Sequence, residues 1–350
     1  MKVLLRHKRG LISFLILLSL YSIAVFAGFI SPYHYETEQR LYSYSPPVKL
    51  HFKDAEGKFH LTPFIYKYDF KLDENRSRVY TENKTKAYKL KFLTRGDEYK
   101  FLGFIPSDIH LFGVDKDVQL YLFGSDSRGR DLFSRILYGG RISLSIGLIA
   151  VIITFSLGLI VGGISGYFGG KIDNFLMRMC EMIMLVPGFY LLLALRSSFP
   201  PEIGTVKIYF LIVIILSFIG WASLARVIRG IVLGLREKEF VLAARSIGLS
   251  KIKIIIRHIL PNTSSYTLVA ITLAIPGYIL GESALSLLGL GIQDPVPSWG
   301  NLLTDAMAIA QIKFHPWILL PGFFIFLTVI AFNMLGDALR DIYDPKRRES

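Results

Sequence analysis

The stretch VLAARSIGLSKIKIIIRHILPN, from Val241 to Asn262, is the most informative part of this 350-residue chain. It carries five basic residues and no acid, and it lies between two strongly apolar runs. Phe240 to Ile247 is long enough for about two helical turns, Gly248 suits the position just after a helix, and Ser250 can cap a second helix. Pro261 is expected to stop that second helix. The stretch therefore predicts a short, basic, broken helix between two apolar segments.

The second of these helices combines an apolar stripe with basic positions. The stripe comprises Ile252, Ile255, Ile256 and Ile259, and the polar positions are Lys251, Lys253 and Arg257. Such a helix can lie at a membrane surface, where its basic residues are held by anionic lipid. It can equally dock its stripe into a groove on a partner protein. The residues themselves leave both possibilities open.

Most of the remaining chain consists of apolar runs of membrane length. Hydrophobic residues make up 52% of the chain, and a transmembrane helix needs about 20 mostly apolar residues. Six runs qualify: Leu11–Ile30, Ile142–Ser165, Phe175–Leu195, Ile208–Ile228, Leu268–Leu290 and Trp317–Leu335. The sequence thus predicts an all-α polytopic membrane protein with six transmembrane helices, of which the last five form a core over residues 142–336. Pro187 and Pro276 interrupt two of the runs and predict kinks, which suit either close packing or a cavity.

The distribution of charge predicts how the chain crosses the membrane. The formal net charge is +13, and residues 226–257 contain eight Lys or Arg against two Glu. Short basic segments beside apolar runs mark the cytoplasmic side, so this pattern does not indicate a nucleic-acid surface. Residues 1–10, 229–264 and 337–350 are predicted to be cytoplasmic. The first run could be a signal peptide, but its length favours a retained transmembrane helix.

Residues 31–122 form the longest polar segment and are predicted to lie outside the membrane. Alternating apolar and polar residues with Gly, Asp and Asn turns predict strands, and hence a small β-rich extracytoplasmic insertion between the first two transmembrane helices. The expected strands are Val48–Phe52, Phe59–Phe70, Ala87–Leu93 and Tyr99–Ile105. Residues 123–141 are predicted to form a separate amphipathic helix at the membrane interface, with Arg130, Arg135 and Arg141 off its apolar face.

Three ionisable residues fall inside the predicted transmembrane helices. Arg178 and Glu181 stand three residues apart, so a local ion pair is the favoured interpretation over a transport site. Glu282 has no neighbouring partner in sequence and is a functional candidate, because carboxylates within membrane spans are costly. It could bind a cationic group, cap a broken helix or pair with another span.

The sequence lacks the motifs of an enzyme that would power its own transport. It contains no phosphate-binding loop, no nucleophile–base motif and no cluster with metal-ligand spacing. We therefore expect no catalytic residue, no metal and no cofactor of its own. A separate ATPase or an ion gradient would have to supply the energy.

The opening stretch resembles the cytoplasmic coupling motif of ABC-importer permeases, which starts Glu-Ala-Ala and closes Leu-Pro. The matching positions are Ala243, Ala244, Gly248, Leu260 and Pro261, whereas Leu242 stands where that motif usually has Glu. The resemblance implies that this loop seats on an ATPase subunit and transmits nucleotide-driven closure. We expect docking to survive the loss of the acid.

Four further segments carry the resemblance from about residue 123 to residue 346: GSDSRGRDLFSRILYGGRISL, GYFGGKID, GESALSLLGLGIQDPVPSWGNLL and LTVIAFNMLGDALRDIYDP. They are similar to the second permease subunit of the dipeptide/oligopeptide/nickel importers. The resemblance implies the type I importer permease fold in a bacterial inner membrane, with alternating access. It also implies a paralogous permease, two cytoplasmic ATPases that bind ATP and magnesium, and an extracytoplasmic solute-binding protein. Residues 31–122 fall outside it.

Two other functions remain open on residues alone. An ion-coupled secondary transporter would be expected to show inverted repeats and ionisable residues in both halves. A membrane anchor for an external sensing or structural domain would not need five further transmembrane helices.

Overall fold

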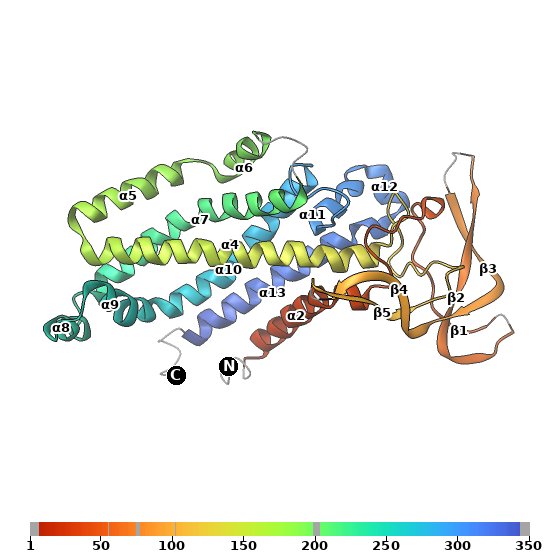
Figure 1. Ribbon diagram of the computed structural model, residues 1–350, viewed down its shortest axis with the longest axis horizontal. Helices are drawn as coiled ribbons and strands as arrows, with labels where there is room; N and C mark the ends of the chain where they lie inside the picture. The colour runs from red at the N-terminus through yellow and green to blue at the C-terminus, as the bar shows by residue number, and fades with distance from the viewer. Residues whose placement is uncertain (1–6, 55, 75–77, 102, 199–203, 344–350) are drawn as a thin grey trace. The chain divides into compact units, whose positions relative to one another are not determined.

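The computed structural model describes residues 7–54, 56–74, 78–101, 103–198 and 204–343. Two compact units make up the chain (Figure 1). The first, here called the core unit, comprises Met1–Leu17, Leu144–Leu285 and Leu327–Ser350. The second, here called the sheet unit, comprises Leu18–Ser143 and Ser286–Phe326.

Within the described residues, five helical segments are long and apolar enough to cross a membrane. They contain the helices α2 (Lys8–Val25), α4 (Leu132–Phe168), α7 (Thr205–Leu235), α10 (Ser264–Leu287) and α13 (Leu320–Tyr343). The chain is therefore mostly helical and polytopic, as its apolar runs predict.

The third predicted transmembrane helix, Phe175–Leu195, is not confirmed as one continuous helix. Its run is divided between α5 (Gly170–Leu185) and α6 (Gly188–Ser197), which are separated by Val186 and Pro187. Proline lacks a backbone N–H and disfavours helical geometry in the preceding residue, so the break falls where Pro187 predicts it.

The separate interfacial helix predicted over residues 123–141 is wrong. Leu132 begins α4, a single helix of 37 residues that continues through the second apolar run. Residues 123–131 precede it as turns and a short bridge between Ser125 and Asp131. The amphipathic pattern there reflects burial against protein, because Leu132, Ile136 and Leu137 are all less than 5% exposed.

Glycines let α4 approach α7 closely within the core unit. A Cβ added at Gly158, Gly162 or Gly166 would lie 2.5 to 2.7 Å from atoms of α7. These three glycines repeat every four residues and form one face of α4, the small-residue pattern that allows membrane helices to pack tightly. The close packing makes α4 a rigid support for whatever contacts its ends.

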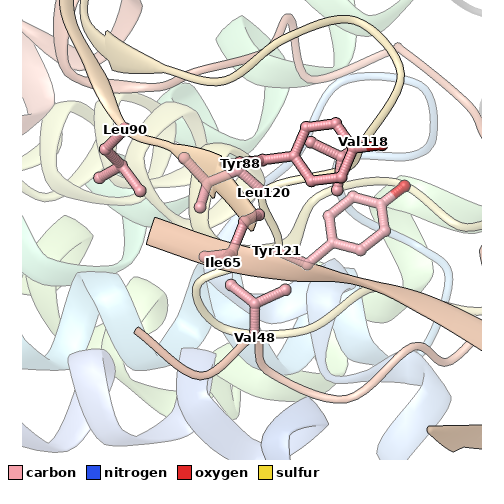
Figure 2. Packing of buried hydrophobic residues seen from close by; sticks show 7 residues of the cluster. All are labelled: Val48, Ile65, Tyr88, Leu90, Val118, Leu120 and Tyr121. Carbon is pink, nitrogen blue, oxygen red and sulfur yellow. The ribbon is translucent and has the colours of Figure 1, made fainter. Parts of the chain in front are cut away.

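Two small antiparallel sheets lie in the sheet unit. One has the order β1–β2–β3, formed by His51–Lys53, Phe59–Leu72 and Arg78–Lys89, and the other pairs β4 (Lys91–Phe101) with β5 (Ile105–Gly113). A hydrophobic core cluster beside the first sheet consists of Val48, Ile65, Tyr88, Leu90, Val118, Leu120 and Tyr121 (Figure 2), and Phe112 of β5 packs against it. The sequence does not predict the full length of strand β3, because eleven of its twelve residues are exposed or only partly buried and give no apolar alternation.

Candidate functional site

The basic stretch of the core unit folds as two short helices joined at a glycine. They are α8 (Glu239–Ser246) and α9 (Lys251–Ile254). Gly248 has φ of +80°, and its N–H donates to the Arg245 carbonyl at 2.9 Å, while the Leu249 N–H donates to the Ala244 carbonyl at 3.2 Å. This pair of bonds is the Schellman motif, which favours glycine at its left-handed position. The predicted break at Gly248 is confirmed.

Two details of the predicted local structure are wrong. Ser250 occupies the position before α9, but its side chain makes no capping hydrogen bond. Pro261 does not stop the helical path: it lies at the start of a 3-10 turn, Leu260–Thr263, that leads directly into α10. Proline is tolerated in a first helical turn because its missing N–H would have no partner there.

The predicted isoleucine stripe divides into a buried half and an exposed half. Ile255 and Ile259 are 5% and 0% exposed, whereas Ile252 and Ile256 are 67% and 59% exposed. Residues Ile255–Ile259 form a π-helical turn, which changes the angular spacing that a regular helix would give. The inner pair therefore holds the segment to the core unit, and the outer pair is available to a partner.

The same division continues into α8. Val241 and Ala244 are buried, while Ala243 is exposed. We call the large exposed apolar side chains of the two helices the outer apolar set: Phe240, Leu242, Ile247, Ile252 and Ile256.

Polar contacts fasten this segment to the end of α4. The Arg245 Nε donates to the Tyr167 hydroxyl at 3.3 Å, and the guanidinium lies 5.1 Å from the centre of the Tyr167 ring. The ammonium of Lys251 lies 5.5 Å from the centre of the Phe168 ring. A displacement of the segment would therefore act directly on α4.

Asp173, in the motif GYFGGKID, connects its own helix α5 to two further helices. Its carboxylate accepts hydrogen bonds from Ser165 of α4 and from Arg229 of α7, with Arg229 Nε at 3.0 Å. The guanidinium of Arg229 holds the pKa of Asp173 below its usual value. This ion pair fixes the start of α5 against α4 and α7.

An apolar cavity of about 540 Å³ lies in the core unit between α4, α7 and α10, with Gly188 at one edge. Four hydroxyl-bearing side chains interrupt its apolar wall: Thr154, Ser223, Tyr266 and Tyr278. The Tyr278 hydroxyl donates to Thr154 Oγ1 at 2.9 Å. Such a wall offers hydrogen bonds without a fixed charge. Sequence analysis missed these residues, because hydroxyls scattered through apolar runs give no motif.

The ionisable candidates do not line this cavity. Arg178 and Glu181 form the predicted ion pair, Nη1 to Oε2 at 2.9 Å, with side chains 81% and 42% exposed. Glu282 is 0% exposed and follows Gly281, a residue of the cavity wall. Ser283 Oγ lies 3.4 Å from a Glu282 carboxylate oxygen. The Glu282 side chain is therefore buried behind the residues that line the cavity.

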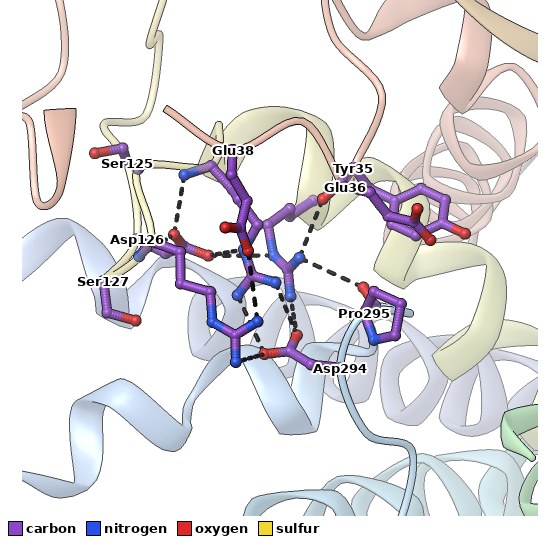
Figure 3. A network of polar contacts seen from close by, with 12 residues as sticks. Tyr35, Glu36, Glu38, Ser125, Asp126, Ser127, Asp294 and Pro295 are labelled. Carbon is purple, nitrogen blue, oxygen red and sulfur yellow. Dashed lines mark hydrogen bonds and ion pairs between the residues drawn. The ribbon is translucent and has the colours of Figure 1, made fainter. Parts of the chain in front are cut away.

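A buried charge network occupies the sheet unit (Figure 3). Arg130 donates to Asp126 at 2.7 Å and to both oxygens of Asp294 at 3.1 and 3.2 Å. Arg135 donates to Asp294 at 2.7 Å and to the Tyr35 carbonyl at 3.1 Å. Burial opposes ionisation of Asp294, but Arg135 and Arg130 outweigh it and hold its pKa below the usual value. Sequence analysis missed the network, since its partners are far apart in sequence.

These features define a polytopic membrane protein with a cavity between its helices and a basic segment whose outer apolar side chains are exposed. The chain belongs to the family "Binding-protein-dependent transport system inner membrane component", which matches residues 155–349. Residues 1–47 match the "N-terminal TM domain of oligopeptide transport permease C". The strands β1 to β5 lie between these two matches.

Similar proteins are peptide permeases. The chain is 45% identical to the oligopeptide transport system permease protein OppC of Haemophilus influenzae over 65% of this chain and 71% of that protein. It is 43% identical to the dipeptide transport system permease protein DppC of Bacillus subtilis, over 65% and 69%. The inward-facing MetNI methionine ABC transporter shares 15% identity at a TM-score of 0.45, covering 59% of this chain and 96% of that chain, a similarity too low to support an assignment.

Family membership sets aside the two other functions. The chain is a transmembrane permease subunit of an ATP-binding-cassette importer, and it is a transport component rather than an enzyme. It is a multi-pass protein of the inner membrane.

Proposed function

We propose that this chain forms half of the translocation pathway for peptides or similar small solutes, and that a paralogous permease forms the other half. The names of its relatives support a peptide substrate. The apolar cavity with hydroxyl groups on its wall suits peptides whose side chains vary. Its wall offers hydrogen bonds, but it carries no fixed charge that would select for substrates of one sign of charge. Lipid surrounds the outer helices, and no nucleic acid takes part.

The remaining partners follow from the same proposal. Two cytoplasmic ATPases bind ATP and magnesium, so this chain holds no cofactor and no metal. An extracytoplasmic solute-binding protein delivers substrate. Both termini and residues 229–264 face the cytoplasm, where short basic segments are enriched. The strands between residues 51 and 113 then face the outside.

Residues 239–263, here called the coupling segment, are the site at which closure of the ATPases is transmitted to this chain. The observation that carries this proposal is the two-sided structure around Gly248. The exposed side chains Ile252, Ile256 and Ala243 contact the ATPase. The buried side chains Ala244, Ile255 and Ile259 pack against the rest of the core unit. Leu260 and Pro261 continue this contact into α10. Closure of the ATPases would thus move α4 and α10 and switch access to the cavity.

The buried Glu282 has a supporting part in this proposal. Its position behind Gly281 suggests that it holds α10 in place rather than contacting substrate. Arg178 and Glu181 are exposed and pair locally, so we assign them no place in the pathway.

A glycine replacement tests the coupling segment. Gly248→Val forces a β-branched residue into φ of +80°, which costs about 1 kcal/mol or more locally and disrupts the Schellman motif. We expect ATP-dependent uptake by the reconstituted importer to fall at least several-fold while the complex still assembles. ATP hydrolysis should become uncoupled from uptake.

Gly57 supplies a matched control. It has φ of +85°, and like Gly248 it has no atom within 4 Å of an added Cβ. Gly57→Val should impose similar strain and leave uptake unchanged. If Gly248→Val leaves uptake intact, the coupling assignment is wrong.

A further inference from the structure

The β4–β5 hairpin of the sheet unit contacts α3 (Ala27–Ile30), the short helix that follows the first membrane-length helix (Figure 1). Three contacts fix its direction. A Cβ at Gly96 would lie 3.6 Å from the Pro32 carbonyl, Tyr99 packs against Gly28, and the rings of Phe101 and Phe26 are 5.7 Å apart. As β4 advances along its sequence, its neighbours thus step backward from Pro32 to Phe26, toward the end of the first membrane-length helix. The hairpin therefore points toward the membrane-spanning segment.

The end of the hairpin reaches the level where that segment ends. The candidate span is Lys8–Val25, and Phe26 follows it directly. Phe101 already lies beside Phe26, and β5 does not begin until Ile105. Each strand residue advances about 3.3 Å, and the described residues Gly103 and Phe104 lie beyond Phe101, so we expect them to extend further toward the hydrocarbon.

Large apolar side chains are exposed at this end. Phe104 is 72% exposed and Ile105 is 46% exposed, and on the helix Val25 and Phe26 are 44% and 42% exposed. Lys100, also exposed, stands just before them. Aromatic and aliphatic residues with a flanking lysine are typical of membrane interfaces, because the ammonium can reach headgroups while the apolar groups enter the acyl boundary.

The backbone at the end of the β4–β5 hairpin can tolerate a position in the membrane interface. Phe101 pairs with Ile105 across the hairpin, the Gly103 N–H donates to the Lys100 carbonyl at 3.2 Å, and the Phe104 N–H donates to the Phe101 carbonyl at 3.3 Å. These internal bonds lower the cost of leaving water, since unsatisfied backbone groups are what exclude irregular chain from lipid.

We propose that the end of the β4–β5 hairpin inserts Phe104 and Ile105 into the lipid bilayer beside the first transmembrane helix. The hairpin is then a second, monotopic membrane anchor that holds the sheet unit at the surface. That the leaflet is the outer one rests on the orientation proposed above, but the insertion itself does not.

A depth measurement on the full-length chain tests the insertion. Cys180 is the single cysteine and is 0% exposed, and a Cys180→Ala background removes it. Phe104→Cys is labelled with an environment-sensitive fluorophore in the assembled importer, reconstituted in liposomes. We expect a spin-labelled phospholipid to quench this label several-fold more than a control label, and aqueous iodide to quench it several-fold less.

Leu93→Cys is the matched control, because Leu93 lies at the opposite end of β4 and is 66% exposed. Ile105→Cys provides a second reporter, so a single poorly behaved variant cannot decide the result. Lipid quenching no greater at positions 104 and 105 than at position 93 would overturn the proposal. Protection from iodide without lipid quenching would also overturn it and would indicate a protein contact. Neither readout depends on transport, so failure here is distinguishable from failure of the proposed function.

Discussion

Two stretches of this chain are rich in basic residues and behave in opposite ways. Arg130 and Arg135 beside the start of α4 are 4% and 1% exposed and are paired with carboxylates. Arg245 and Lys253 of the coupling segment are exposed. The difference comes from two acids, Asp126, which lies four residues before Arg130, and Asp294, which stands 164 residues after it. A basic stretch is buried only where the fold brings an acid to it.

The physical reason is the cost of removing charge from water. A buried guanidinium loses several kcal/mol of solvation, and only close carboxylates with good hydrogen-bond geometry offset this loss. Arg130 and Arg135 share Asp294, and Asp126 completes the network. The basic side chains Arg245 and Lys253 of the coupling segment need no such acids, because they stay in contact with water.

Removal of Asp294 should have the largest effect on stability. It takes away an acid that pairs with the buried arginines and has no counterpart in the coupling segment. Asp294→Ala leaves two nearly buried guanidinium groups without their shared acid. We expect a loss of about 3 kcal/mol in stability, at the low end of the usual range because Asp294 is 37% exposed. Thermal unfolding of the detergent-solubilised chain measures the change.

Glu181→Ala is the control for this prediction. It removes an exposed ion pair with Arg178, which should change stability by no more than about 1 kcal/mol. Equal effects of the two substitutions would show that the buried network stabilises nothing.

Sequence alone accounts for the elements that depend on neighbouring residues. The break at Gly248, the interruption at Pro187 and the ion pair of Arg178 with Glu181 each follow from local spacing, and the structure contains all three. The burial of Arg135 and the exposure of Ile252 could not be predicted. The first depends on a distant acid, and the second departs from the single apolar face that the isoleucine spacing predicts, because Ile255 is buried while Ile252 is exposed.

Asp131 sharpens the comparison, because it is an acid in the buried stretch without a basic partner of its own. It precedes α4, and its Oδ2 accepts from the Ser134 N–H at 2.8 Å and from the Ser134 hydroxyl at 2.6 Å. Its other oxygen is buried and has no hydrogen-bond partner among the described residues. Burial raises the pKa of Asp131 to about 7. The neutral acid is thus the form that the fold favours.

The pH dependence of Asp131 follows from this shift. Because its pKa is higher in the folded chain than in the unfolded chain, Asp131 should lower stability as pH rises from about 4 to about 7. Asp131→Asn keeps the cap and should flatten this dependence. Asp131→Ala removes the cap and should cost about 1 kcal/mol. Unfolding temperatures between pH 5 and pH 8 test both, and an unchanged pH slope in Asp131→Asn would contradict the shifted pKa.

The smallest effect is expected at Leu242, where the exposed stretch departs from its family. Leu242 is 43% exposed and belongs to the outer apolar set, so an apolar contact can replace the acid that the coupling motif usually carries. Leu242→Glu should change stability by no more than about 0.5 kcal/mol, because it alters one exposed side chain. It should not increase ATP-dependent uptake. Leu41→Glu, at a leucine of the sheet unit that is 65% exposed, controls for the added charge. A several-fold rise in uptake with Leu242→Glu alone would mean that this coupling segment is a weakened one, and that charge rather than apolar contact orients the ATPase on it.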